Sequence, residues 1–277
     1  MLLEDKYKAK LHLLCKTKLN SKHLVQAINT YALPSLLYGA AVLNWSDLEL
    51  KTLDIKTRKI LRTYNILGIN NSVERLYIKR DFGGKGLINI YEKVRQMEKN
   101  TLNNILRRKT KDHLLQIVNT DKTIFIKYSN TLDVLKSKPL HGKFFHNPDM
   151  SKKTHLWLKN NQITPHLEQL IFSAQEQVIR TNNYQKFIEK RTEVDPLCRF
   201  CHEHPETTQH ILSACSVLAR TDYIKRHNKM GEVVYQKASQ AANIFHNKNK
   251  EIPPVIESAT HKFYWDFPIK TYKTVQT

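Results

Sequence analysis

The amino-acid sequence predicts a mainly α-helical protein. Glycine is scarce, with 7 residues in 277, and most segments repeat apolar residues at helical intervals instead of alternating them as strands do. Four helices are expected in the first part of the chain, over residues 3–19, 22–44, 47–66 and 88–108. Hydrophobic residues make up 40% of the chain, which suffices for two small domains or one elaborated domain with real cores.

The helix expected over 47–66 has a clear beginning and two different faces. Ser46 and Glu49 have the spacing of a capping box, in which two side chains satisfy free amide groups at a helix N-terminus. The apolar face carries Leu50, Leu53, Ile60, Leu61 and Tyr64. The basic face carries Lys51, Arg58, Lys59 and Arg62. This basic face is either a surface that follows a phosphate backbone or an ordinary solvated face.

The second half of the chain has fewer periodic segments. Residues 109–160 are polar, basic and weakly periodic, which predicts an extended basic linker. A helix is expected to restart with Thr164 as its cap and Pro165 at its first position. Further helices are expected over 217–227 and 231–244. The predicted parts are a helical module (1–108), the linker (109–160), helices with a Cys/His motif (161–250) and a tail (251–277).

Four side chains that can bind a metal ion lie close together near the C-terminal end. Cys198, Cys201, His210 and Cys215 form the pattern C-x2-C-x8-H-x4-C. The first cysteine pair can hold one side of a tetrahedral zinc ion, and the later His and Cys can hold the other. The motif predicts one structural Zn²⁺. A disulfide or packed thiols are the alternatives, and His202 or His204 could replace His210.

Two further features are less specific. Cys15 lies in an amphipathic helical stretch, which is typical of a core thiol. The segment DFGGKGL at 81–87 contains three glycines and a lysine and could in principle cradle a phosphate. Its spacing matches neither a Walker nor a dinucleotide-binding pattern, so a tight structural turn is favoured.

The charge of the chain points to a polyanionic partner. The formal net charge is +20, and residues 51–150 carry 21 Lys or Arg against 9 Asp or Glu. Nucleic acid is the first candidate and an anionic membrane surface the second, while a basic protein without a specific polyanion is the plain alternative. The most apolar run, residues 31–45, is too short to span a bilayer and contains Pro34. No secretory signal pattern opens the sequence, so an intracellular location, nuclear or cytoplasmic, is expected.

With these segments placed, the chain resembles the C-terminal part of the polyprotein of non-LTR retrotransposons that use a restriction-like endonuclease. The resemblance rests on four sequence segments: INTYALPSLLYGAAVLNW, ELKTLDIKTRKIL, RLYIKRDFGGKGL and CRFCHEHPETTQHILSACSVLARTDYIKRHN. The resemblance covers nearly the whole chain and is weakest between 109 and 160. It implies that residues 1–108 form a thumb-like module after a reverse transcriptase palm, and that the last segment is the CCHC zinc knuckle before the endonuclease.

The chain departs from that family in the residues that perform chemistry. Reverse transcription needs paired aspartates for two metal ions, and no Asp-Asp dipeptide occurs. Near the end only Asp266 is available, so residues 251–277 are expected to be the truncated start of an endonuclease-like region. The sequence therefore predicts no enzymatic activity.

The expected function is non-catalytic binding of RNA or DNA, without a membrane partner. A polymerase encoded upstream is a candidate protein partner. The candidate contacts are Lys51, Arg58, Lys59, Arg62, Arg199, Phe200, Lys225 and Arg226. The alternative is a scaffold or interaction protein, or an inert retrotransposon relic, in which zinc only stabilises the fold.

Overall fold

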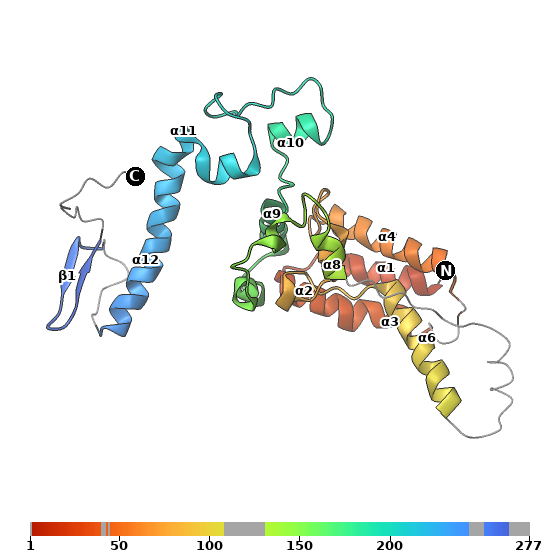
Figure 1. Cartoon of the computed structure of the whole chain (residues 1–277). Coiled ribbons are helices and arrows are strands. Elements are labelled where there is room, and N and C mark those ends of the chain that lie inside the picture. The colour runs from red at the N-terminus through yellow and green to blue at the C-terminus, as the bar shows by residue number, and fades with distance from the viewer. Residues whose placement is uncertain (1, 40–42, 44, 108–130, 244–251, 266–277) are drawn as a thin grey trace. The chain divides into compact units, whose positions relative to one another are not determined.

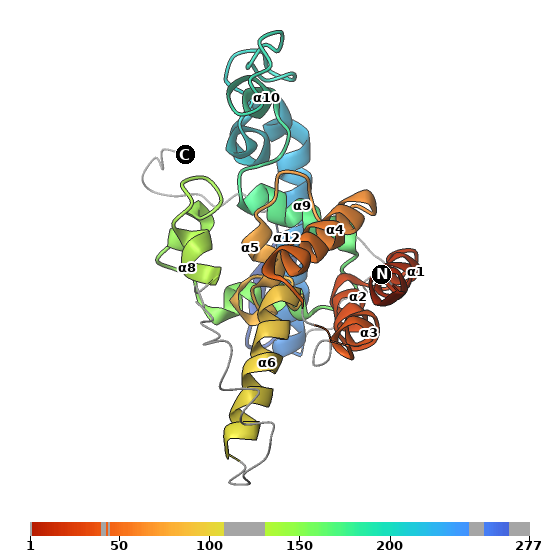
Figure 2. The same ribbon diagram turned by 90° about the vertical axis from the view of Figure 1, so that its right-hand side faces the viewer.

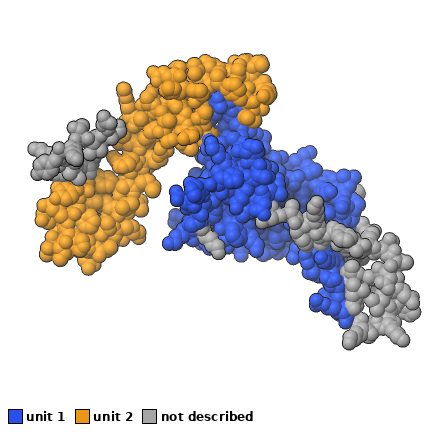
Figure 3. Space-filling view, in the orientation of Figure 1, with its two compact units in different colours: residues 1–184 blue, residues 185–277 orange. Residues whose placement is uncertain are grey.

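The computed structural model describes residues 2–39, 43, 45–107, 131–243 and 252–265. The chain divides into two compact units, residues 1–184 and residues 185–277 (Figure 3). Most of the described residues are helical, and the strands among them form one short hairpin (Figure 1). The predicted mainly α fold is therefore confirmed. In the described part of the chain, no helix combines the length and the apolar character that crossing a bilayer requires.

Unit 1 is built around a helical core. Its N-terminal helices are α1 (Leu2–Cys15), α2 (Ser21–Ala27), α3 (Leu33–Leu37), α4 (Asp47–Thr63) and α6 (Ile90–Arg107). Helix α1 packs against α3 and α4, and α4 packs against α6, while α6 extends beyond the other helices in both views (Figures 1 and 2). The core between them consists of buried aliphatic side chains, among them Leu11, Leu24, Ile28, Leu36, Leu50, Leu61 and Ile90.

The helix expected over 22–44 is interrupted. A π-helical turn, η1 (Ile28–Ala32), joins α2 to α3, and the N–H of Leu33 donates to the carbonyl of Ile28. Pro34 then occupies the first turn of α3. Because proline has no N–H, it cannot continue the regular hydrogen-bond ladder. The chain accommodates it by widening the preceding turn.

Helix α4 begins as its sequence predicts. The Ser46 hydroxyl accepts a hydrogen bond from the Glu49 N–H at 3.2 Å, and the Glu49 carboxylate accepts one from the Ser46 N–H at 2.8 Å. On the inner side, the buried carboxylate of Asp54 accepts hydrogen bonds from the N–H groups of Ile90 and Tyr91. Helix α4 therefore also caps the beginning of α6.

The glycine-rich segment is a buried turn. It begins within the 3-10 turn η2 (Arg80–Phe82), which follows α5 (Val73–Tyr77). A Cβ atom at Gly84 would lie 2.1 Å from the backbone oxygen of Ile78, so no larger residue fits there without movement. Lys85 is 1% exposed, and its ammonium lies 2.8 Å from the carboxylate of Glu168. The only cation of the DFGGKGL loop is thus already bound by the protein itself.

Residues 131–160 differ from the predicted linker. They form α8 (Thr131–Lys136), the 3-10 turn η3 (Lys143–His146) and the 3-10 helix η4 (Lys152–Lys159). Leu135 and Phe145 are buried together with Ile78 of the preceding turn. These elements therefore belong to unit 1. These helices are too short to produce a periodic pattern of apolar residues, and for this reason the sequence predicted a linker here. The rest of the predicted linker, 109–130, lies outside the described residues.

Helix α9 (Pro165–Gln175) begins at the predicted cap but belongs to unit 1. The Thr164 hydroxyl accepts a hydrogen bond from the Leu167 N–H at 3.2 Å. Glu168 within the helix and Glu176 at its C-cap form buried ion pairs, with Arg80 at 2.7 Å and with Arg75 at 3.4 Å respectively. The helix was expected to lie with the Cys/His motif, whereas these ion pairs fix it to the α5 region.

Unit 2 contains a long helix and a hairpin. After α10 (Asn182–Phe187) crosses the boundary, the helical elements are η5 (His210–Ala214), α11 (Ser216–Leu218), η6 (Ala219–Tyr223) and α12 (Ile224–Ala241). The two helices expected over 217–227 and 231–244 are one continuous helical stretch to residue 241. Gly231 lies within α12 and does not end it, and its missing side chain leaves room for the ring of Trp265.

The tail folds back on α12. Strands β1 (Val255–Glu257) and β2 (Lys262–Tyr264) pair antiparallel, with Ile256 opposite Phe263. The ring of Tyr235 on α12 makes edge contacts with the rings of Phe263 and Trp265. The sequence predicts a single opening strand here, and the structure has a hairpin. Asp266 and the residues after it lie outside the described part.

Candidate metal centre and basic surfaces

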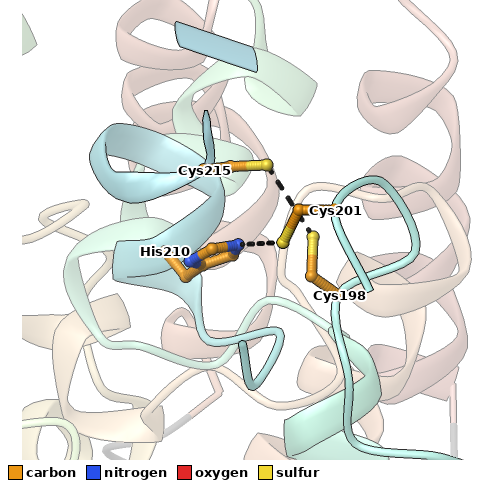
Figure 4. A group of neighbouring side chains, drawn as sticks. All are labelled: Cys198, Cys201, His210 and Cys215. Atoms are coloured by element: carbon orange, nitrogen blue, oxygen red, sulfur yellow. Dashed lines mark hydrogen bonds between the residues drawn. The ribbon is translucent and has the colours of Figure 1, made fainter. Parts of the chain in front are cut away.

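The first cysteine pair lies in a tight loop. Leu197 and Pro205 form an isolated antiparallel bridge, and the Cys198 N–H donates to the His204 carbonyl at 2.8 Å. Within the loop, the His202 N–H donates to the Cys198 carbonyl at 2.9 Å, and His202 has a left-handed φ of 57°. This turn brings Cys198 and Cys201 to the same side of the loop (Figure 4).

The second pair is held by a π-helical turn. The Cys215 N–H donates to the His210 carbonyl at 2.9 Å, across five residues. This bond closes η5 and brings residues 210 and 215 to one side of the turn. In Figure 4 both side chains point toward the cysteine loop.

The four side chains can hold one metal ion. Their ligand atoms all lie within 4.8 Å of one another. The sulfur atoms of Cys198 and Cys215 are 3.9 Å apart, and the Cys201 sulfur is 3.4 Å from Nε2 of His210. A tetrahedral ion with metal–sulfur bonds of ~2.3 Å separates its sulfur ligands by ~3.8 Å, so the spacing fits. It is too long for a disulfide, whose sulfurs are ~2.05 Å apart.

Backbone groups favour the thiolate form that a metal ligand needs. The Phe200 N–H donates to the sulfur of Cys198 at 3.4 Å, although burial outweighs this contact and raises the pKa of Cys198. The N–H of Glu203, helped by that of His204, lowers the pKa of Cys201. His202 and His204 are exposed and are not members of the four-residue group in the described structure. His210 is therefore the histidine of this site.

Two supporting side chains could not be found from the sequence. The buried carboxylate of Glu206 accepts hydrogen bonds from Nε of Arg199 at 2.8 Å and from the Arg199 N–H at 2.9 Å. The hydroxyl of Tyr223 accepts a hydrogen bond from the Cys215 N–H at 3.1 Å and donates one to the carbonyl of His210 at 3.0 Å. These contacts hold the loop and the π-helical turn in place. The spacing of the residues in the sequence does not predict them.

Cys15, the fourth cysteine, is separate from this centre. It packs against the core of unit 1. Burial raises the pKa of its thiol to about 12. Cys15 is thus a partly buried thiol at the edge of the core that was predicted to contain it.

The predicted contacts around the metal loop have different environments. Phe200 is 45% exposed at the tip of the loop, and Lys225 is exposed on α12. Arg199 is engaged with Glu206. The guanidinium of Arg226 donates to the carbonyl of Leu212 at 2.6 Å and lies over the ring of Tyr223. The two arginines thus also support the fold of the site.

The basic face of α4 is not uniform. Lys51 and Lys59 are exposed. Arg58 is half-buried and donates to the hydroxyl of Tyr77 at 3.0 Å, which in turn donates to Asp54 at 3.3 Å. Arg62 is also half-buried. Arg58 therefore helps to compensate the charge of a buried carboxylate. It was predicted to be a nucleic-acid contact, but in the structure it is not a free surface residue.

A pocket beside this face is electrostatically mixed. Lys51 and Arg58 line a cavity of about 450 Å³ together with Asp54, Glu74 and Glu92. Burial, with a contribution from Asp54, raises the pKa of Glu92. Carboxylates therefore interrupt the basic face where it borders the pocket. An anion bound there would gain little favourable electrostatic energy.

Comparison with known proteins assigns no family. No protein-family model matches the chain, and no curated protein matches it.

Proposed function

We propose that this chain is a non-catalytic nucleic-acid-binding protein whose unit 2 is organised by one structural zinc ion, and that it derives from the C-terminal part of a retrotransposon reverse transcriptase polyprotein. The observation that carries the proposal is the assembled Cys198, Cys201, His210 and Cys215 group. It is followed directly by a helix with exposed cations. The sequence resemblance supplies the evolutionary part of the proposal.

Zinc is the metal that these ligands favour. Three thiolates and one imidazole form a soft, tetrahedral ligand set, which is typical of Zn²⁺. Four protein ligands leave no open position for water or substrate, so the ion has a structural role. Unit 2 needs such support, because its described β-structure is limited to a short hairpin and one isolated bridge, and much of α12 is exposed.

The positive surface is the reason for proposing nucleic acid as the partner. The chain carries a formal charge of +20. Exposed lysines lie on both units, with Lys51 and Lys59 on α4 and Lys225 and Lys229 on α12. Lysines that are free to move can neutralise phosphates and release counterions. Arg58 and Arg199 are left out of this surface. Arg58 donates to the hydroxyl of Tyr77 near the buried Asp54, and Arg199 forms an ion pair with Glu206.

The test is the salt dependence of binding to a labelled single-stranded oligonucleotide, as DNA and as RNA. The logarithm of affinity should fall linearly with the logarithm of salt concentration, by ~0.7 for each phosphate contact with a single strand. Changing Lys225 and Lys229 to Glu should weaken binding and flatten this slope. The control is Lys153→Glu together with Lys190→Glu, which changes the net charge equally at other exposed positions.

Equal loss in both variants would indicate a general charge effect. The absence of salt-dependent binding in the zinc-loaded chain would refute the proposal and favour the scaffold or relic alternative. Metal analysis of the same preparation should give one zinc per chain.

A further inference from the structure

Unit 2 contains a pocket that the metal centre does not use. It lies between the beginning of α12 and the end of the hairpin, and its volume is about 570 Å³. The residues that line it are Tyr223, Ile224, His227, Asn228 and Trp265. Pockets of this size accommodate small ligands, and their walls are commonly apolar and aromatic with a few polar groups.

The indole of Trp265 forms the wall opposite α12, and the helix is built to admit it. A Cβ atom at Gly231 would lie 2.9 Å from Cη2 of Trp265, so alanine would crowd the ring. The backbone N–H of Trp265 donates to the carbonyl of Pro254 at 2.8 Å, and the indole ring makes an edge contact with the ring of Tyr235 at 5.7 Å between centroids. Glycine destabilises a helix interior. At position 231 this cost is offset because the absence of a side chain allows the Trp265 ring to pack against α12.

The polar side chains of the pocket are suited to the edge of a planar ligand. The amide oxygen of Asn228 accepts a hydrogen bond from Nδ1 of His227 at 3.2 Å. This contact orients the amide and leaves its NH₂ group as a donor. An amide beside aromatic rings is the combination with which proteins read unstacked nucleobases.

The surroundings of the pocket are positively charged. Lys225 and Lys229 are exposed on the same helical stretch that supplies Ile224 and Asn228. A base inserted beside Trp265 would place its sugar-phosphate near the pocket rim, where these ammonium groups can approach it.

We infer that this pocket binds a nucleobase of a single-stranded nucleic acid, by stacking against Trp265 and by a hydrogen bond from Asn228. The inference rests on the proposed function and adds a second kind of contact to it. Phosphate neutralisation is insensitive to the presence of bases, whereas stacking requires one.

The pocket is also connected to the metal centre. Tyr223 contributes to its lining, and the hydroxyl of the same side chain bonds to the backbone of Cys215 and His210. Metal removal should therefore weaken base-dependent binding as well as the metal loop.

The experiment compares two oligonucleotides of equal length, one with thymine or adenine bases and one with abasic sites throughout except at its labelled end. Fluorescence anisotropy gives both affinities in the zinc-loaded full chain. A variant with Trp45→Phe and Trp157→Phe leaves Trp265 as the only tryptophan, and quenching of its fluorescence reports stacking directly. Free nucleoside monophosphates form a further arm that separates a nucleotide site from a strand-binding site.

The base-bearing strand should bind more tightly by about 5- to 150-fold, which corresponds to the usual strength of one base–aromatic stack. Trp265→Ala should abolish this difference, and Trp265→Phe should retain part of it. Asn228→Ala removes a polar group from an exposed position, so it tests the pocket without endangering the fold. It should reduce the difference without changing the salt slope. Tyr264→Ala, an exposed aromatic outside the pocket, is the matched control.

Equal affinity for base-bearing and abasic strands would overturn the pocket inference and leave the proposed function intact. Failure to bind either strand would overturn both. Loss of the difference in Tyr264→Ala as severe as in Trp265→Ala would show that the hairpin, and not the pocket, is responsible, and would also overturn the inference.

Discussion

Replacing Glu168 with glutamine should destabilise unit 1 strongly although the two side chains have nearly the same shape. The carboxylate is 1% exposed and lies 2.8 Å from the ammonium of Lys85, which is equally buried. The substitution leaves that ammonium without a counter-ion in the protein interior. Removing one partner of a buried ion pair costs about 3–5 kcal/mol. Arg80 contributes less to this cost, because it is 14% exposed and also bonds to the carbonyl of Leu158.

A double-mutant cycle isolates this cause. Lys85→Met removes the buried ammonium, so the double variant Glu168→Gln with Lys85→Met should lose less stability than the sum of the single variants, by about 1–3 kcal/mol. Urea unfolding measured by circular dichroism gives the free energies. Fluorescence of Trp157, whose ring contacts Phe172, reports the same region. Asp5→Asn, at an exposed carboxylate paired with Lys8, is the control and should behave like the parent chain.

The effect should also depend on pH. Burial acts to raise the pKa of Glu168, but the charges of Lys85 and Arg80 outweigh it and hold the pKa below its usual value. A carboxylate with a lowered folded-state pKa stabilises the protein above its unfolded pKa of ~4.3, and this stability is lost as pH falls through the folded value. The difference between parent and variant should be full at pH 7 and shrink below about pH 4. A variant as stable as the parent at pH 7, or additive single effects, would refute the reasoning.

Three further outcomes are expected. Cys201→Ser, or a strong chelator, should release the metal and unfold the region around residues 195–228 while the circular dichroism of unit 1 persists; zinc analysis with limited proteolysis checks this. Gly84→Ala should cost about 3 kcal/mol because its Cβ would meet the Ile78 carbonyl, whereas Gly86→Ala, with φ of 78° but only ordinary contacts at 3.8 Å to Arg80, should cost only ~1–2 kcal/mol; urea unfolding separates them. Tyr223→Phe should lower zinc affinity by about 10-fold, measured by competition with a chromophoric chelator.

Local signals explain why part of the fold was predictable. The capping box at Ser46 and Glu49 and the Thr164–Pro165 start depend on neighbours within one turn, and both occur as predicted. The metal group was also predictable, because ligand chemistry restricts which residues can occupy its positions. In these cases the residues that decide the structure lie within a short stretch of sequence.

Long-range pairing explains what was missed. The sequence gives no sign that Arg58 compensates Asp54 or that Lys85 pairs with Glu168, since a charged residue reads as exposed unless its partner is known. The same limit applies to residues 131–160. Their apolar side chains do not recur at a helical period, and only the fold shows that Leu135 and Phe145 are buried together with Ile78. Burial of charge and packing of short turns are decided by contacts that periodicity does not register.

The buried ion pairs of unit 1 have a consequence for its synthesis. Lys85 and Arg75 meet carboxylates that follow them by 83 and 101 residues. At a translation rate of about 5–20 residues per second, the ribosome needs ~5–20 s to make that stretch. During this interval the emerging helices cannot enclose their two cations, so they remain open to chaperones and proteases. A ribosome that stalls before residue 176 would therefore display an unfinished unit 1, because Glu176 supplies the second of the two buried carboxylates.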